Sequence, residues 1–272
     1  MNRIRNKIGY RYMLVRQQVE RLWFLTPEGR GHRERLVGLR GGHKGRRCFI
    51  ICNGPSLKRT DVRLIKGEVT IGSNGLFLLF QETGFRPTIL TVEDPLVAED
   101  RAAELNAIRG VTKVFPRDLA RFLRPDPDTT YLHFIRAYRD FPRFTDQLER
   151  EAFWGGTVTF LNLQLAYHLG CNPIYLIGCD HNYVVPENVE KARQAGETAV
   201  ITSQTDDPNH FHPSYFGKGY RWHDPQVERM ESAYRAAGSF LAARGVQVYN
   251  ATDGGRLEVF ARVRFADLVG SV

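Results

Sequence analysis

Short apolar strands alternating with helices predict an α/β protein with a Rossmann-like, doubly wound and mostly parallel sheet. Three observations carry this prediction. The expected strands span four to six residues, the segments between them contain good helix formers, and small or polar residues follow each strand. At 272 residues the chain is long enough to bury a substantial core around one such sheet.

The first expected strand, residues 47–52, reads Arg-Cys-Phe-Ile-Ile-Cys and is bounded by glycines before it and an Asn-Gly-Pro turn after it. The apolar runs and the turn residues predict the other elements in the same way. Further strands are expected at 69–71, 88–92, 112–115, 173–177 and 246–249, and helices at 76–81, 97–108, 118–122, 157–169 and 224–244. We expect an irregular insertion over 124–153 and a lid-like polar segment over about 184–222.

The positive charge is concentrated at the N-terminus. The whole chain has a formal net charge of +8, and residues 1–47 contain thirteen Lys or Arg against three Glu. Apolar residues recur at helical spacing from Ile4 to Leu25, which predicts a basic amphipathic helix. We therefore divide the chain into an N-terminal arm, residues 1–44, and a catalytic domain, residues 45–272. The arm is expected either to contact an anionic membrane surface or to pack on the body or on a partner chain.

Other classes of protein are disfavoured. No run of about 18 apolar residues predicts a membrane span, and no secretory signal is evident. Four cysteines without C-x-x-C spacing indicate buried thiols in a reducing compartment. Basic and aromatic residues do not interleave along the body outside residues 131–144, so nucleic acid is not an expected partner. We expect a cytoplasmic protein, peripheral at the inner membrane if the arm binds lipid; the oligomeric state is not predicted.

The residues that follow the strands predict the functional site, because ligands of doubly wound sheets bind at the carboxyl ends of the strands. Asn53-Gly54-Pro55-Ser56 follows the first strand, and its backbone N–H groups and small Gly54 suit a phosphate. The alternative reading is an ordinary turn. The other strand ends are Ser73-Asn74-Gly75, Glu93-Asp94, the segment from Gly178 through Asp180 to Tyr183, and Asn250-Ala251-Thr252. Neither a Walker loop nor a GxGxxG turn is present.

A second candidate cluster lies in the lid-like segment and just after it. His210, His212 and His223 occur with Tyr215 and Tyr220 within fifteen residues. Such a group could supply a general base, bind phosphate or, together with Asp94 or Asp180, hold a divalent ion.

Several motifs resemble those of two related families in the same order along residues 47–262. Cys52 to Leu57 resembles the Gly-Asn-Gly-Pro-Ser-Leu turn of the Campylobacter-type sialyltransferases and of the MptE-like domain family. Gly156-Thr157 through Gly170, followed by Ile174 to Asp180, resembles their helix and Ile-Tyr-Leu-x-Gly-x-Asp strand. Trp222-His223-Asp224 lies where the sialyltransferases have their catalytic His, and Tyr249 to Thr252 resembles their closing segment.

The sialyltransferase resemblance implies a glycosyltransferase of surface glycan or polysaccharide biosynthesis. Its donor would be a nucleotide sugar, a CMP-activated acidic sugar being favoured, and its acceptor a glycan or a lipid-linked precursor. His223 would be the general base, and no metal would be required. The tyrosines that stabilise the leaving phosphate in that family have no clear counterpart, since Asn182 occupies one position; Tyr183, Tyr215 or Tyr220 would substitute. Cys52 also replaces the first Gly of the family turn.

The MptE-like resemblance implies a different reaction, pyrophosphoryl transfer from ATP to a 6-hydroxymethylpterin. Asp94 and Asp180 would then bind Mg²⁺, and Asn53 and Ser56 the phosphates. A nucleotide-binding module without catalysis is the third alternative. The expected nucleotide-binding residues are Asn53, Gly54, Pro55, Ser56, Ser73, Asn74, Gly156, Thr157, Gly178, Asp180 and Asn250. If the protein is a transferase, the catalytic candidates are His223, Tyr183, Tyr220, His210 and His212.

Overall fold

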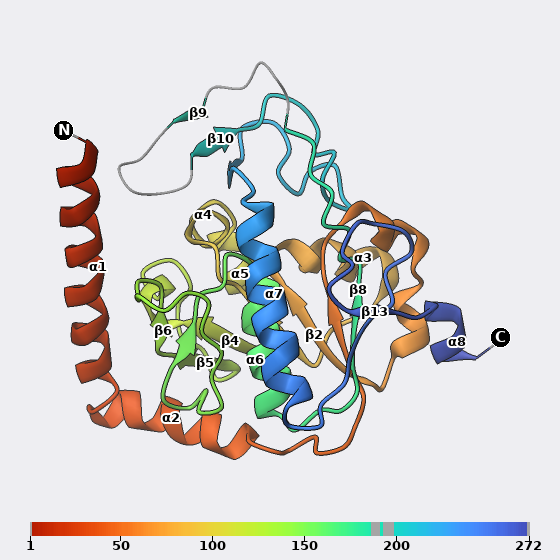
Figure 1. Cartoon of the computed structure of the whole chain (residues 1–272), viewed down its shortest axis with the longest axis horizontal. Helices are drawn as coiled ribbons and strands as arrows, with labels where there is room; N and C mark the ends of the chain where they lie inside the picture. Colours follow the sequence, from red (N-terminus) through yellow and green to blue (C-terminus); the bar gives the residue numbers. More distant parts are fainter. Residues whose placement is uncertain (1, 186–190, 193–198, 271–272) are drawn as a thin grey trace.

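The computed structural model describes residues 2–185, 191–192 and 199–270 and contains the predicted α/β sheet (Figure 1). Eight strands follow the order β13-β12-β8-β1-β2-β3-β4-β5, and neighbouring strands are parallel. The strands are β1 (Cys48–Ile51), β2 (Val69–Ser73), β3 (Ile89–Thr91), β4 (Thr112–Pro116), β5 (Thr129–Leu132), β8 (Ile174–Ile177), β12 (Val248–Asn250) and β13 (Ala261–Arg262).

Helices cover both faces of the sheet. The α-helices are α1 (Asn2–Trp23), α2 (Pro27–Leu39), α3 (Phe80–Thr83), α4 (Pro95–Asp100), α5 (Ala102–Ala107), α6 (Val158–His168), α7 (Val227–Ala242) and α8 (Phe265–Val269). Four 3-10 helices accompany them: η1 (Pro55–Arg59), η2 (Val62–Ile65), η3 (Asn74–Leu79) and η4 (Arg117–Leu119). The helices α6 and α7 pack together on one face, in front of the sheet in Figure 1.

The side chains of β1 show how the two faces are filled. Cys48 and Ile50 belong to a buried cluster with residues of α6 and α7, whereas Phe49 and Ile51 belong to another with residues of η1 and η2. Successive side chains of a strand point to opposite faces, so an uninterrupted apolar strand such as β1 requires cover on both. All four cysteines are buried and free, as the sequence predicts.

The order of the strands identifies the switch point of the sheet. From β1 the chain proceeds through β2, β3, β4 and β5 in one direction, and it then returns to place β8 on the other side of β1. The crevice between the carboxyl ends of β1 and β8 is where ligands of doubly wound sheets bind.

Several segments differ from the elements expected from the sequence. The helix expected over 118–122 is only the short η4, and the helix expected over 76–81 is divided between η3 and α3. The sequence patterns do not indicate α2, β13 or α8. The helix predicted over 97–108 is two helices, α4 and α5, because Arg101 leaves helical geometry and directs its buried guanidinium toward residues 214 and 215. The 124–153 insertion contains the edge strand β5 and a small pair, β6 (Phe134–Ile135) with β7 (Ala152–Phe153). The lid-like segment contains β9 (Lys191–Ala192) and β10 (Val200–Thr202), which form a sheet with β11 (Arg221–His223).

The N-terminal arm consists of two helices. α1 stands along one side of the molecule, opposite the C-terminus (Figure 1), and α2 lies against β5. Thr26 caps α2, and His32 of α2 accepts a hydrogen bond from the Tyr131 N–H at 3.0 Å. No helix in the described part of the chain has the length and apolar character needed to cross a bilayer.

Candidate active site at the carboxyl edge of the sheet

The turn after β1 is closed by Asp180, which follows β8. The Ser56 N–H donates to both Asp180 carboxylate oxygens at 3.2 Å, and the Ser56 hydroxyl donates to Oδ2 at 2.6 Å. The Gly54 N–H donates to the Gly178 carbonyl at 2.8 Å. These hydrogen bonds lock the β1 turn to the β8 end across the switch point. The N–H groups of Gly54 and Ser56 are therefore engaged within the protein.

Gly54 is required by this closure. A Cβ atom at Gly54 would lie 2.0 Å from Asp180 Oδ2 and 2.7 Å from the Gly178 carbonyl oxygen. The sequence suggests that Gly54 admits a ligand, but the group that approaches it closely in the structure is the Asp180 carboxylate. Pro55 begins η1 directly after it, and its missing N–H is no loss at that position.

Two asparagines at the ends of β1 and β2 carry unused acceptors. Asn53 Nδ2 donates to the Ser73 carbonyl at 3.1 Å, which links the two strand ends. Among the described residues, the Oδ1 atoms of Asn53 and Asn74 are buried and accept no hydrogen bond. A buried polar atom without a partner costs free energy. The two carbonyl oxygens are thus ready to accept hydrogen bonds from a ligand at this edge.

Part of the lid-like segment covers the same edge. The Phe211 N–H donates to the Asn53 carbonyl at 2.9 Å, and the Gly75 N–H donates to the Tyr215 hydroxyl at 3.2 Å. The ring of His210 stacks on that of Tyr215, with centroids 4.0 Å apart and planes 1° apart. Burial raises the pKa of Tyr215, so its hydroxyl stays protonated at neutral pH.

His210 is itself held by a carboxylate. Its Nδ1 lies 2.7 Å from Asp207 Oδ2, which also accepts the Phe216 N–H at 2.9 Å. Burial works to raise the pKa of Asp207, but His210 and the N–H groups of Asn209 and Phe216 together outweigh it, so that pKa is lowered. The orientation of the His210 ring is thus set by both Asp207 and Tyr215.

A second His–Asp pair lies at the end of β3. His223 Nε2, at the end of β11, lies 3.5 Å from Asp94 Oδ1. The same Asp94 oxygen accepts the Leu96 N–H at 2.8 Å and so caps α4. Arg221 bonds to Asp100 of α4, with 3.2 Å between Nε and Oδ1, and this fixes β11 beside α4. A carboxylate next to an imidazole orients the ring and stabilises its protonated form, as a general base requires.

The N-terminus of α6 points to the same edge. Thr157 caps the helix by accepting the Thr159 N–H at 3.3 Å, and Thr159 Oγ1 lies 3.4 Å from Cys52 Sγ at the end of β1. Gly156 precedes the cap with φ +80°, a conformation that favours glycine. An eleven-residue helix brings a partial positive charge to this point.

The remaining candidates have contacts of their own within the protein, and Tyr183 also lies near Cys52, Cys179 and Asp180. Tyr220 packs beneath the Arg101 guanidinium, 3.9 Å from its ring centroid, and His212 Nε2 lies 4.0 Å from Glu82 Oε1 of α3. Tyr183 is directed toward α7, its hydroxyl 3.9 Å from Met230 Sδ, and burial raises its pKa. Asn250 is fully buried, and its amide bonds to the Leu257 carbonyl and the Thr252 N–H, so it shapes the loop after β12.

Asp94 and Asp180 follow strands that are not neighbours in the sheet. They follow β3 and β8, which are separated by β1 and β2. Three strand spacings amount to roughly 14 Å, and each carboxylate already has other partners. Within residues 2–185, 191–192 and 199–270, no group of three or more His, Cys, Asp or Glu side chains is arranged to hold a metal. Each carboxylate could contribute only a single ligand to a phosphate-bound Mg²⁺.

The sequence patterns do not indicate two charged partners at the site, Asp207 and Arg136. Asp207 lies three residues before His210, a spacing that a search for carboxylates beside histidines would reveal. Buried Glu93, next to Asp94, pairs with Arg136 at 2.8 Å, and Arg136 also pairs with Asp118 at 2.5 Å. These partners are distant in sequence, so no local pattern indicates the pairing.

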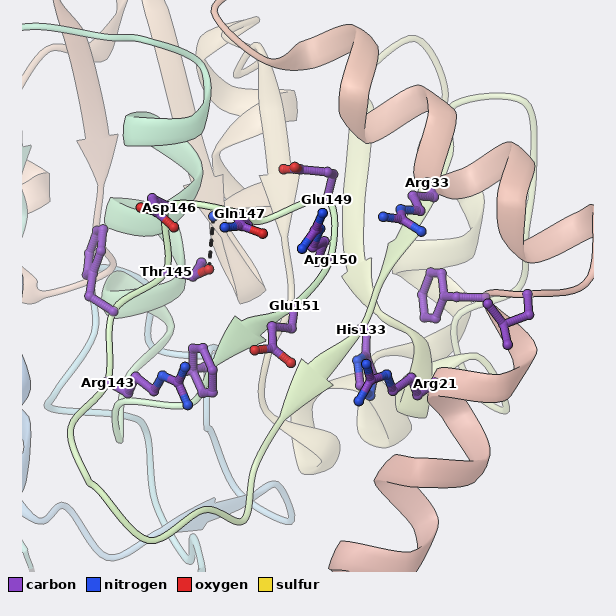
Figure 2. Close-up of a pocket in the computed structure, with 14 residues that line it drawn as sticks. Arg21, Arg33, His133, Arg143, Thr145, Asp146, Gln147, Glu149, Arg150 and Glu151 are labelled. Carbon is purple, nitrogen blue, oxygen red and sulfur yellow. Dashed lines mark hydrogen bonds between the residues drawn. The ribbon is translucent and has the colours of Figure 1, made fainter.

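A cavity of about 470 Å³ lies elsewhere, between the base of α1 and the segment 143–153. Figure 2 shows Arg21 and Arg33 on one side of it and Arg143 on the other. None of the predicted site residues lines it, and its four arginines face three acidic residues. Its charges nearly cancel, so we do not assign it as the active site.

Comparison with known proteins identifies the family. The model described as 6-hydroxymethylpterin diphosphokinase MptE-like matches residues 32–185, more than half of the chain. The chain belongs to the MptE-like family. The matched region of this MptE-like protein includes the β1 turn, Asn74, Asp94 and Asp180, whereas His210 and His223 lie beyond it.

No curated protein matches the chain. Among solved structures, the MAf glycosyltransferase from Magnetospirillum magneticum AMB-1 is similar, with a TM-score of 0.48 and 17% identity. The similarity covers 85% of this chain but only 38% of that protein. The MptE-like chain therefore spans less than half the length of this neighbour, and a likeness at this level says nothing about activity.

Proposed function

We propose that this MptE-like protein is a nucleotide-dependent transferase, and that it transfers a glycosyl group from a nucleotide sugar to a hydroxyl of a glycan or lipid-linked acceptor. The pairing of His223 with Asp94 at the carboxyl edge of the sheet carries this proposal. A CMP-linked acidic sugar is the favoured donor, on the resemblance of the β1 turn and the His223 segment to the sialyltransferases.

The proposed donor site lies over the ends of β1, β8 and β2. The unpaired Oδ1 atoms of Asn53 and Asn74 would accept hydrogen bonds from donor groups of the nucleotide. The N-terminus of α6 would face its phosphate. Closure of the β1 turn by Asp180 makes the turn a rigid wall of the site.

His223 would act at the end of β3, two strands from β1. In the proposed step, the acceptor hydroxyl oxygen bonds to the anomeric carbon and gives its proton to His223. The bond from that carbon to the phosphate oxygen breaks, and the nucleotide leaves with the bonding electrons. Asp94 would hold the imidazole and stabilise the imidazolium that forms. His210, oriented by Asp207 and Tyr215, is a candidate to contact the leaving phosphate in addition to the N-terminus of α6.

Family membership favours one other function, Mg²⁺-dependent pyrophosphoryl transfer from ATP to a hydroxymethylpterin. Mg²⁺ would neutralise charge on the transferring phosphates. Asp94 or Asp180 could each supply one ligand, the rest coming from phosphate and water.

Nucleotide binding followed by turnover separates the alternatives. We would measure thermal shifts with CMP, CDP, UDP, GDP and ATP, with and without Mg²⁺, and then product formation in EDTA. Glycosyl transfer predicts a shift with CMP and turnover that survives EDTA. A shift with Mg·ATP alone, and turnover abolished by EDTA, would establish the diphosphokinase instead. Binding of a nucleotide without consumption for any acceptor would indicate a non-catalytic module.

A further inference from the structure

The outward face of α1 carries an unusual concentration of apolar side chains. Five of the eight large hydrophobic residues that are exposed in the described chain lie on α1 or directly after it. They form what we call the apolar stripe: Tyr12, Val15, Val19, Leu22 and Leu25, each 59–66% exposed. A contiguous exposed apolar surface marks an interaction site more often than scattered single residues do.

The stripe is held away from the body by the contacts on the opposite face of α1. Gln17 is buried; its Nε2 donates to the Ala137 carbonyl at 3.0 Å, and its Oε1 accepts the N–H groups of residues 136 and 137. At 100° per residue, Val15 and Val19 each lie roughly 160° around the helix from Gln17. Docking of α1 through Gln17 therefore turns the stripe outward, where no other part of the described chain covers it.

The charges around the stripe select the kind of partner. Helix α1 contains Arg3, Arg5, Lys7, Arg11, Arg16 and Arg21 but one acidic residue, Glu20. Glu20 forms an ion pair with Arg16, with 3.2 Å between Arg16 Nε and Glu20 Oε1. In the described chain, Arg11 and Arg21 are exposed and form no ion pair. A second copy of α1 laid on the stripe would bring arginine against arginine without a free carboxylate between them, whereas an anionic surface would be attracted.

Two arginines lie at the base of α1, beside the Leu25 end of the stripe, although the cavity that they line also contains Asp146, Glu149 and Glu151. The cavity of about 470 Å³ is lined there by Arg21 and Arg33, and Leu25 of the stripe lies at the same cavity. Figure 2 shows the Arg33 guanidinium directed into it from α2. Within the described ranges, neither arginine takes part in an ion pair. Apolar and cationic groups thus meet at one end of the stripe.

We propose that α1 docks the protein on a membrane surface rich in anionic lipid. The apolar stripe would enter the interface between headgroups and acyl chains, and Arg11 would contact lipid phosphates beside it. Arg21 and Arg33 would meet phosphates only at the Leu25 end of the stripe. This inference is independent of the reaction proposed above, because it involves none of the residues at the sheet edge.

Vesicle binding of the full chain tests the proposal. Vesicles of phosphatidylcholine with about 30 mol% phosphatidylglycerol should bind the protein, and pure phosphatidylcholine vesicles should bind it at least about tenfold more weakly. Val15→Gln/Val19→Gln should lower the partition coefficient by more than about tenfold. Arg21→Gln/Arg33→Gln should lower it by about tenfold or more, and raising the salt from about 0.1 M to about 0.5 M should do the same.

Two matched variants outside α1, at η2 and directly after it, are the controls. Leu64→Gln removes another exposed apolar side chain, and Lys66→Gln another exposed cation; both should bind vesicles as the wild type does. Absence of binding to anionic vesicles would overturn the proposal. So would a dimer in light scattering that Val15→Gln/Val19→Gln converts to a monomer, since the stripe would then be an interface between two copies. Loss of binding to an equal degree in the Leu64 and Lys66 variants would also count against it.

Discussion

His223 Nε2 lies 3.5 Å from Asp94 Oδ1, which joins a histidine of the β11 strand to the carboxylate that ends β3. Removal of a positioned general base costs about 10²–10⁴-fold in rate. We expect His223→Ala to lower kcat by that amount while the Kd for nucleotide, measured by calorimetry, changes little. His212→Ala is the matched control, because its ring faces Glu82 rather than this edge. A parallel loss of nucleotide affinity in His223→Ala would assign His223 to binding instead.

Asp94 has a structural role as well as a proposed catalytic one, and one substitution separates them. Asp94→Ser retains a side chain that can cap α4 but removes the charge next to His223. We expect kcat to fall by about tenfold to a hundredfold and its pH profile to move to lower pH, because an imidazolium without its carboxylate loses its proton more readily. The melting temperature should change little. An unchanged pH profile would show that Asp94 only caps the helix.

The unpaired carbonyl of Asn74 can be removed without straining the backbone. Asn74 has φ +51°, a conformation that glycine also adopts. Asn74→Gly should weaken nucleotide binding about fivefold to tenfold, the equivalent of one hydrogen bond, while the free energy of unfolding falls by less than about 1 kcal/mol. Calorimetric titration with CMP and with ATP checks the first expectation and urea unfolding the second. If the affinity for every nucleotide is unchanged, the nucleotide does not contact Asn74 and its site does not include the end of β2.

The closure of the β1 turn is expected to be a major element of stability. In Gly54→Ala the new methyl group would overlap Asp180 Oδ2, so either the turn or the carboxylate must move. We expect the free energy of unfolding to fall by about 2–4 kcal/mol. Gly38→Ala, in α2 with open space around it, should instead raise it by about 0.5–1 kcal/mol. Equal stability of Gly54→Ala and the wild type would mean that the turn opens easily.

The parallel sheet was predictable because apolar strands and the polar residues after them are local signals. The same signals indicated Asn53, Asn74 and Asp180 at one edge. What the residues do there depends on contacts across the sheet, which no local pattern contains. Asp180 closes the β1 turn, and Asn250 supports a loop. From the sequence alone, a residue with either of these structural roles looks the same as a residue that binds a ligand.

The strands missed in the insertion and in the lid-like segment are short or lie at an edge. Strand β5 is a four-residue edge strand, and β6, β7 and β9 have two residues each. Runs of this length show no periodicity that distinguishes them from loops. They form because the surrounding fold supplies partners: α2 packs along β5, and the Arg221–Asp100 pair holds β11 against α4.

The buried pair of Glu93 and Arg136 predicts a pH dependence of stability. Burial raises the pKa of Glu93 to about 7, although Arg136 acts to lower it. A carboxyl whose pKa is raised in the folded state contributes stability below its unfolded pKa, and that contribution is lost as the pH rises through about 7. Glu93→Gln should therefore become more stable relative to the wild type as the pH rises from about 5 to about 8.

Buried histidines change the free energy of unfolding with pH in the opposite direction, and their contribution must be separated from that of Glu93. Burial lowers the pKa of His32 to about 4 and also lowers the pKa of His168, so their contribution to stability is lost as the pH falls below about 6.5. The wild type and Glu93→Gln share these histidines. The histidine contribution therefore cancels in the difference between the two free energies of unfolding, measured in urea at each pH. A difference that stays constant from about pH 5 to about pH 8 would show that Glu93 remains ionised throughout, held by Arg136.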